Sequence, residues 1–148
     1  MSTPVRIVAF DTDGNKRELR MTRTGALAVS QLYYDESQYL ELAEPDTAYS
    51  FFGPKAGQQF VITNIIMFAD KQVSATTNAL VEIYEGLSAD ATTPDKTLLK
   101  MELGQLQSMV IPVQNLLVSE GLWVNAQTDD DDVHMNILGH YIPVERQI

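Results

Sequence analysis

Hydrophobic and polar residues alternate along most of residues 47–148. The clearest case is residues 96–103, in which Leu99 and Met101 share one side of the segment while Lys100 lies on the other. A period of two is typical of a β-strand with one buried and one solvated side. Similar short segments recur with turn residues between them, and these are residues 49–52, 79–85, 108–113, 121–126, 133–138 and 139–144. The pattern predicts a mainly β protein, an antiparallel β-sandwich.

Three stretches depart from simple alternation. Residues 58–69 are apolar on both sides, which we interpret as a strand in the middle of the sandwich. Residues 26–46 are ambiguous, because residues 26–29 could continue as a strand while residues 35–44 could form one or two helical turns, and periodicity does not separate these structures. Residues 115–120 also favour a helix. These are the helical expectations in an otherwise β chain.

The first thirty residues predict an extended arm. Residues 4–10 are β-prone, residues 11–15 (Asp-Thr-Asp-Gly-Asn) are strong turn formers, and a second short run covers residues 18–22. This order predicts a β-hairpin, which is too small to be stable alone and should lie against something else. We therefore divide the chain into an arm (residues 1–30), a linker (31–46) and a sandwich domain (47–148).

Charge supports this division. The chain has 148 residues and a formal net charge of −10. Residues 1–30 hold five cations against three acids, a net +2, which leaves five cations against 17 acids, a net −12, for residues 31–148. The arm cations are Arg6, Lys16, Arg17, Arg20 and Arg23. Such asymmetry suggests two parts with different roles.

Composition excludes several classes of function. The acidic balance argues against a protein that binds nucleic acid by neutralising phosphates, and against docking on anionic lipid. With no cysteine there are no disulfides, thiolate metal sites or cysteine nucleophiles. We expect no secretory signal in residues 1–13 and no membrane helix, since the longest apolar run is interrupted by Asn64.

Candidate catalytic and metal-binding residues are few. His134 falls opposite in parity to its apolar neighbours, so we expect it on the wetter face, and His140 could approach it only across a bend. We therefore predict no catalytic residue and no cofactor. The acidic run Asp129, Asp130, Asp131 and Asp132 fits either a Ca²⁺ site at a hairpin turn or a solvated acidic turn.

Several short motifs resemble the small jelly-roll structural proteins of tailed-bacteriophage virions. Residues 57–66 (Gly-Gln-Gln-Phe-Val-Ile-Thr-Asn-Ile-Ile) look like the opening strand of such jelly rolls, and residues 81–85, 121–125 and 139–143 resemble their later strands. Residues 4–29 are similar to the extended arms that precede them.

The resemblance implies a non-enzymatic capsid decoration (cement) protein. Such a protein would be made in the host cytoplasm, form a homotrimer, and bind the major capsid protein or another virion protein at the capsid surface. Its arm would add strands to a neighbour's sheet, in cis or in trans. The alternative is a phage fibre, receptor-binding or carbohydrate-binding module with specificity in residues 69–78, 88–95 and 125–132. A small β-barrel hydrolase or isomerase is a third alternative.

Overall fold

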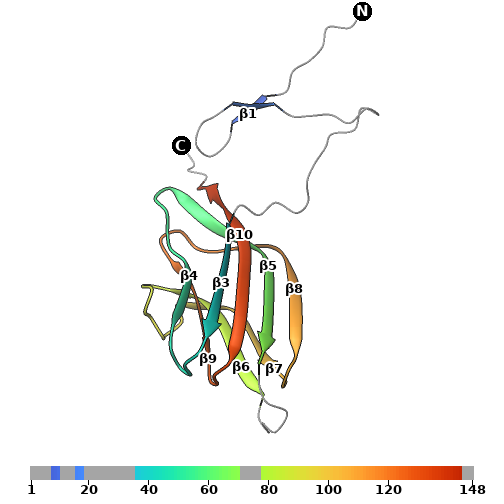
Figure 1. The fold of residues 1–148 in the computed structure, drawn as a ribbon. Coiled ribbons are helices and arrows are strands. Elements are labelled where there is room, and N and C mark those ends of the chain that lie inside the picture. Colours follow the sequence, from blue (N-terminus) through green and yellow to red (C-terminus); the bar gives the residue numbers. More distant parts are fainter. Residues whose placement is uncertain (1–7, 11–15, 19–35, 71–77, 145–148) are drawn as a thin grey trace, which may run out of the picture. The chain divides into compact units, whose positions relative to one another are not determined.

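The computed structural model describes residues 8–10, 16–18, 36–70 and 78–144, and β-strands account for most of them (Figure 1). No helix occurs in these described ranges, so the prediction of a mainly β protein is confirmed. The chain divides into two units, Met1–Leu32 and Tyr33–Ile148.

The first unit contains a short hairpin. Strand β1 (Val8–Phe10) pairs antiparallel with β2 (Lys16–Glu18), and the register joins Val8 to Glu18. A hairpin around the predicted turn is therefore present, but its second strand begins earlier than the predicted residues 18–22. Residues 11–15 and 19–22 lie outside the described part of the chain.

The second unit is a sandwich of two four-stranded antiparallel sheets (Figure 1). We call them the first and the second sheet. The first sheet has the order β3 (Glu36–Leu42), β10 (Val133–Pro143), β5 (Gln58–Ala69), β8 (Ser108–Leu117). The second has the order β4 (Tyr49–Phe52), β9 (Trp123–Thr128), β6 (Ala79–Gly86), β7 (Lys96–Leu103). Eight strands distributed in this order over two sheets form a jelly roll, which confirms the predicted fold class.

The core lies between the two sheets. Side chains that point inward from β5, such as Ile62, Ile65 and Met67, are fully buried. They meet inward side chains of the second sheet such as Val81 and Ile83. Alternation explains this core directly, because successive residues of a strand point to opposite faces of its sheet. Each sheet therefore also has an outer face, which the core does not cover.

Residues 36–42 correct two expectations from the sequence. The sequence predicts a linker with helical turns for this segment, but residues 36–42 form strand β3, which pairs with β10 at the edge of the first sheet. The burial of β3 alternates, with Leu42 fully buried and Tyr39 exposed. Burying Leu40 and Leu42 against the core favours the strand over one or two isolated helical turns, which are marginal in water.

The prediction of a helix at residues 115–120 is also wrong. Strand β8 continues to Leu117, and its pairing with β5 is irregular between Ile62 and Asn64. Asn115 has a φ of 53°, the left-handed region that asparagine tolerates better than most residues. The backbone N–H of Val118 donates to the carbonyl of Phe60 at 2.8 Å, so the chain stays bound to the sheet beyond this bend.

Strand β10 unites two segments that the sequence separates, residues 133–138 and 139–144. The join is a register shift against β5 between Leu138 and Gly139. A Cβ at Gly139 would lie 2.1 Å from the carbonyl oxygen of Val61, so this close approach of two backbones requires glycine. The result is one long strand through the middle of the first sheet.

Candidate interaction face

The outer face of the first sheet is assembled from residues that the strand registers place side by side. One row across the sheet is Glu41, His134, Phe68 and Ser108. Directly paired residues in antiparallel strands point to the same face, so each row exposes its side chains together. The next two rows are Tyr39, Asn136, Ile66 and Val110, and then Ser37, Leu138, Asn64 and Pro112. We call this surface the outer face of the first sheet.

Exposed large hydrophobic side chains gather on this face. The second unit has seven of them among its described residues, and five belong to the outer face of the first sheet: Tyr39, Ile66, Phe68, Val110 and Leu117. Val110 is 62% exposed and Tyr39 is 53% exposed. Single exposed hydrophobics are normal on a protein surface, but a contiguous group marks an interaction site.

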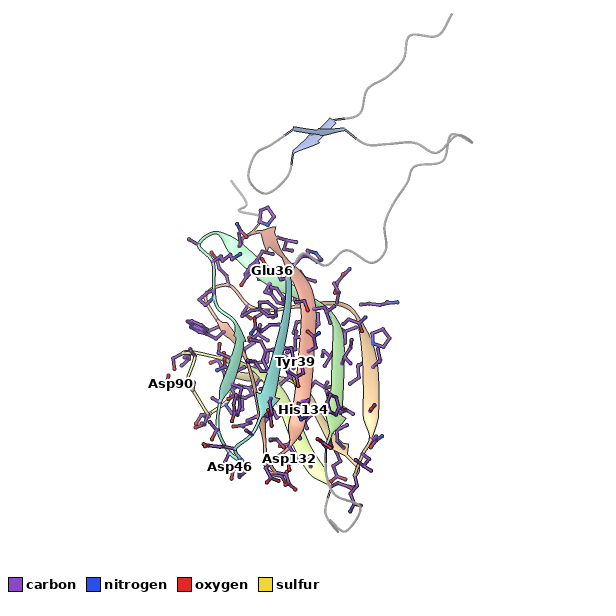
Figure 2. All side chains as sticks on the ribbon, viewed as in Figure 1. Glu36, Tyr39, Asp46, Asp90, Asp132 and His134 are labelled. Carbon is purple, nitrogen blue, oxygen red and sulfur yellow. The ribbon has the colours of Figure 1, made fainter. Side chains whose placement is uncertain are left out.

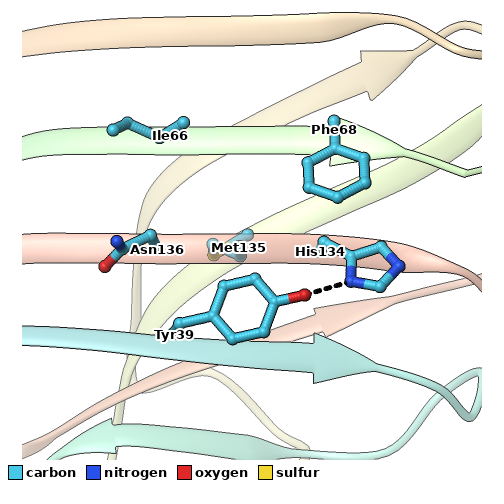
Figure 3. A pocket seen from close by; sticks show the side chains of 6 residues that line it. All are labelled: Tyr39, Ile66, Phe68, His134, Met135 and Asn136. Carbon is cyan, nitrogen blue, oxygen red and sulfur yellow. Dashed lines mark hydrogen bonds between the residues drawn. The ribbon is translucent and has the colours of Figure 1, made fainter.

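Three rings form the centre of this group. The Phe68 and His134 rings are stacked, with centroids 4.4 Å apart and planes 4° from parallel. The hydroxyl of Tyr39 hydrogen-bonds to Nδ1 of His134 from the other side (Figure 3). With Ile66 and Asn136 these rings line a shallow hollow of about 160 Å³. The stacking and the hydrogen bond hold the imidazole between two aromatic neighbours.

A second hollow lies on the same face at the other end of β10. It has a volume of about 310 Å³ and is lined by Val61, Leu117, His140 and Ile142, together with Asn115. Val61 pairs with both His140 and Leu117, so these three residues form another row across the sheet. Apolar lining therefore continues along most of the length of β10.

Formal charge is nearly absent from this surface. Among the described residues that point outward from the first sheet, there is one carboxylate, Glu41, and no lysine or arginine. The rest of the polar groups are amides, hydroxyls and imidazoles, including Ser37, whose hydroxyl donates to Oδ1 of Asn136 at 3.0 Å. A neutral face is unexpected on a body whose net charge is −12.

The outer face of the second sheet is different, because part of it is covered by residues 87–95 of the same chain. Tyr84 points outward and its hydroxyl donates to the carbonyl of Ala91 at 2.6 Å. Nδ2 of the buried Asn125 donates to the carbonyl of Ser88 at 2.9 Å. Burial, and secondly the nearby Glu82 carboxylate, raise the pKa of Tyr84. This loop closes one half of the second sheet's outer face.

The other half of that face is polar and internally paired. The Glu82 carboxylate accepts hydrogen bonds from the Thr97 hydroxyl at 2.6 Å and from the Gln127 amide at 3.1 Å. Lys100 pairs directly with Glu82 in the strand register. Partial burial raises the pKa of Glu82, but the two hydrogen bonds and the Lys100 charge outweigh it, so the net pKa is lowered.

The structure keeps the two histidines apart. Both lie on β10 and point outward, which confirms His134 on the wetter face. They are six residues apart along one strand, which at ~3.3 Å per residue separates them by about 20 Å. They therefore do not form a pair, and each belongs to a different hollow of the outer face.

The acidic turn uses its carboxylates in local hydrogen bonds. Oδ1 of Asp129 accepts from the N–H of Leu80 at 2.7 Å, and Oδ1 of Asp130 accepts from the N–H of Asp131 at 2.8 Å. Asp132 has a φ of 60°, as a tight turn requires. Within the described ranges, no three acidic or histidine side chains are grouped so that they could hold a metal ion. Figure 2 shows Asp132 and Asp46 at the same end of the sandwich.

Two of the predicted arm cations are in the described part of the chain. Lys16 and Arg17 belong to β2, while Arg6, Arg20 and Arg23 lie outside the described residues. Their role as an assembly arm stays a prediction.

Sequence reasoning missed the outer face of the first sheet, although the signal was present. Residues 58–69 are apolar on both sides, and β5 is a central strand of its sheet, as expected. However, a sheet in a two-layer sandwich has one face on the core and one face outside. The apolar residues on the second side, Ile66 and Phe68, are therefore exposed. Hydrophobicity on both sides of such a strand indicates an external contact as well as a core.

No helix among the described residues is long and apolar enough to cross a membrane. Comparison with known proteins adds no relative to this picture, because no protein-family model and no curated protein sequence matches the chain.

Proposed function

We propose that the chain is a non-enzymatic assembly protein of a tailed-phage virion, a capsid decoration protein that reinforces the shell as a homotrimer. Its sandwich contacts neighbouring copies, and its N-terminal arm attaches to the major capsid protein or another virion protein. The fold, a jelly roll, is compatible with this role but does not define it, because one fold serves many functions.

The observation that carries the proposal is the outer face of the first sheet. Five exposed hydrophobic side chains lie there together, with Glu41 as the one carboxylate among the described outward residues. A surface of this kind favours contact with protein, since interface centres are depleted of charge and enriched in aromatic side chains. Catalysis by a pair of histidines is disfavoured, because His134 and His140 lie in separate hollows.

The arm supplies the second part of the proposal. It carries a net +2 beside a body of −12, and its described strands β1 and β2 already form a hairpin. A basic hairpin is suited to add strands to an acidic neighbour's sheet edge, where main-chain hydrogen bonds give affinity and charge gives orientation.

Two measurements test this function. Tailed-phage particles purified from the culture that carries the gene should contain the chain in fixed copy number per shell, as read by quantitative immunoblotting. The full-length double variant Lys16→Glu, Arg17→Glu should be lost from the particles, whereas Lys96→Glu, an exposed cation of the sandwich, should remain. Absence of the wild-type chain from purified particles contradicts the proposal.

A carbohydrate-binding module is the second candidate. The exposed Tyr39 and Phe68 rings beside the Asn136 amide are the observation that favours it, because sugars stack on aromatic rings and hydrogen-bond to amides. A glycan array probed with the full-length protein, with and without EDTA, separates the two functions. A decoration protein gives no hits, whereas saturable binding abolished by Tyr39→Ala supports the module.

A further inference from the structure

We propose that the outer face of the first sheet is the contact between copies of this chain, so that its occupant is the sandwich of a second copy. This inference deepens the proposed function and rests on it in one respect, namely that the protein assembles with itself. It assigns self-association to named residues, and Val110, Ile66 and Tyr39 lie in one row near the middle of the contact.

Charge selects the occupant. Outside this face, the body presents many carboxylates, and one end of the sandwich carries Asp46, Asp70, Asp129 and Asp132. Backbone hydrogen bonds hold this end together, because the N–H of Asp46 donates to the carbonyl of Thr128 and the N–H of Asp70 donates to the carbonyl of Asp132. Two bodies of net −12 would bring like charges together at such surfaces, which costs free energy. The neutral outer face is where two copies can approach without burying opposed carboxylates.

The same argument disfavours the basic arm as the occupant of this face. A segment with five cations is matched by carboxylates, and this face offers one, Glu41, among the described outward residues of the first sheet. Carboxylates are more numerous elsewhere on the sandwich, at its acidic end and on the second sheet, where Glu82 and Glu102 point outward. A neutral surface of aromatic and aliphatic side chains is best matched by a surface of low charge on a second copy.

The size of the face fits a stable contact. Eleven residues of β10 at ~3.3 Å each, and four strands ~4.8 Å apart, give a surface of about 19 by 36 Å, or ~700 Å². Stable interfaces bury ~800 Å² per partner. In a pair of copies the face meets itself, and in a ring of three it meets another surface of the next copy. Both arrangements place Val110 in the contact.

The test measures the mass of full-length protein by light scattering at micromolar concentration. Wild type should have a multiple of the single-chain mass of 16.5 kDa. Val110→Glu should raise the dissociation constant by on the order of a hundredfold or more and give single chains, because it places like charges in the contact. The matched control is Leu87→Glu, which adds the same charge at a residue that is 73% exposed but lies outside this face, and it should keep the wild-type mass.

Folding is checked separately, by circular dichroism and thermal unfolding of each variant. If Val110→Glu does not fold, Ile66→Lys replaces it, since Ile66 also points outward and lysine retains an aliphatic stem. The inference is overturned if wild type is a single chain, if the folded face variant keeps the wild-type mass, or if Leu87→Glu dissociates equally. Retention of a single-chain wild type on purified particles would leave the proposed attachment to the virion standing, while this inference and the homotrimer fail.

Discussion

The two outer faces of the sandwich solve the same problem in different ways. Each sheet presents one face to the core and one face outward. An outward face that is apolar exposes hydrophobic area to water and promotes association. The second sheet covers its face with residues 87–95 and fills the remainder with paired polar groups around Glu82. The first sheet leaves Tyr39, Ile66 and Val110 exposed.

This difference indicates what each face is for. A face that is closed by its own chain has less need of a partner, because the Tyr84 hydroxyl and Nδ2 of Asn125 both donate to carbonyls of residues 87–95. A face with exposed rings and almost no charge remains incomplete, since its apolar area stays in contact with water. The comparison therefore supports the first sheet, and not the second, as the proposed assembly surface.

The largest effect separates the core side from the outer side of β5. In the single-chain Val110→Glu background, Ile65→Ala should lower the free energy of unfolding by ~2–5 kcal/mol, because Ile65 is fully buried and its removal leaves a cavity. Ile66→Ala, one residue further, should cost less than ~1 kcal/mol, because Ile66 points outward. Urea denaturation measures both values.

The order of these two effects is the informative result. Equal costs at Ile65 and Ile66 would mean that both sides of β5 are covered within one chain. That outcome would remove the contrast between the two outer faces.

An intermediate effect concerns the loop that closes the second sheet. Asn125→Ala removes the donor to the Ser88 carbonyl and leaves a buried gap, so it should cost ~1–3 kcal/mol of stability. It should also make residues 87–95 more sensitive to limited proteolysis. Gln127→Ala is the matched control on the same strand, because the Gln127 amide donates to the Glu82 carboxylate and not to the loop. In this variant, residues 87–95 should stay as resistant to proteolysis as in wild type. Unchanged proteolysis in Asn125→Ala would show that the loop is held by other contacts.

The smallest effect is the pH dependence of the polar half of the second sheet's outer face. The pKa of Glu82 is lowered in the folded protein, so its ionised form contributes stability that is present above the unfolded-state pKa and is lost as the pH falls through the folded-state pKa. Wild type should therefore lose more stability below about pH 4.5 than Glu82→Gln does. Because the carboxylate is mostly solvated, the difference should be a few tenths of a kcal/mol. Identical acid-unfolding midpoints would contradict the pairing around Glu82.

Much of the jelly roll could be predicted from alternation alone. Residues 96–103 form β7 with the predicted bounds, because a half-buried strand shows its two faces directly in the sequence. Strand β3 was missed because Tyr39, Leu40 and Leu42 fit helical spacing as well as strand spacing. Pairing with β10, which lies about a hundred residues away in the sequence, decides between them, and a local pattern does not contain that contact.

The candidate site was harder to predict than the fold for a related reason. Tyr39, His134 and Phe68 come from three strands, and their stacking depends on the register between them. Each residue has an ordinary explanation when it is considered alone, as a core aromatic or a surface imidazole. Their joint exposure emerges once the strand order is known.

Hydroxyl-radical footprinting of the full-length wild type at high and low concentration reports the exposure of individual side chains, so it shows whether a second copy covers the outer face of the first sheet. If this face joins copies, Tyr39 and Phe68 are oxidised several-fold more slowly in the concentrated sample, while Leu87, outside this face, reacts equally in both. Protection at Leu87 without protection at Tyr39 and Phe68, or equal reactivity of all three side chains at both concentrations, would contradict the claim that the first sheet's outer face joins copies of this chain.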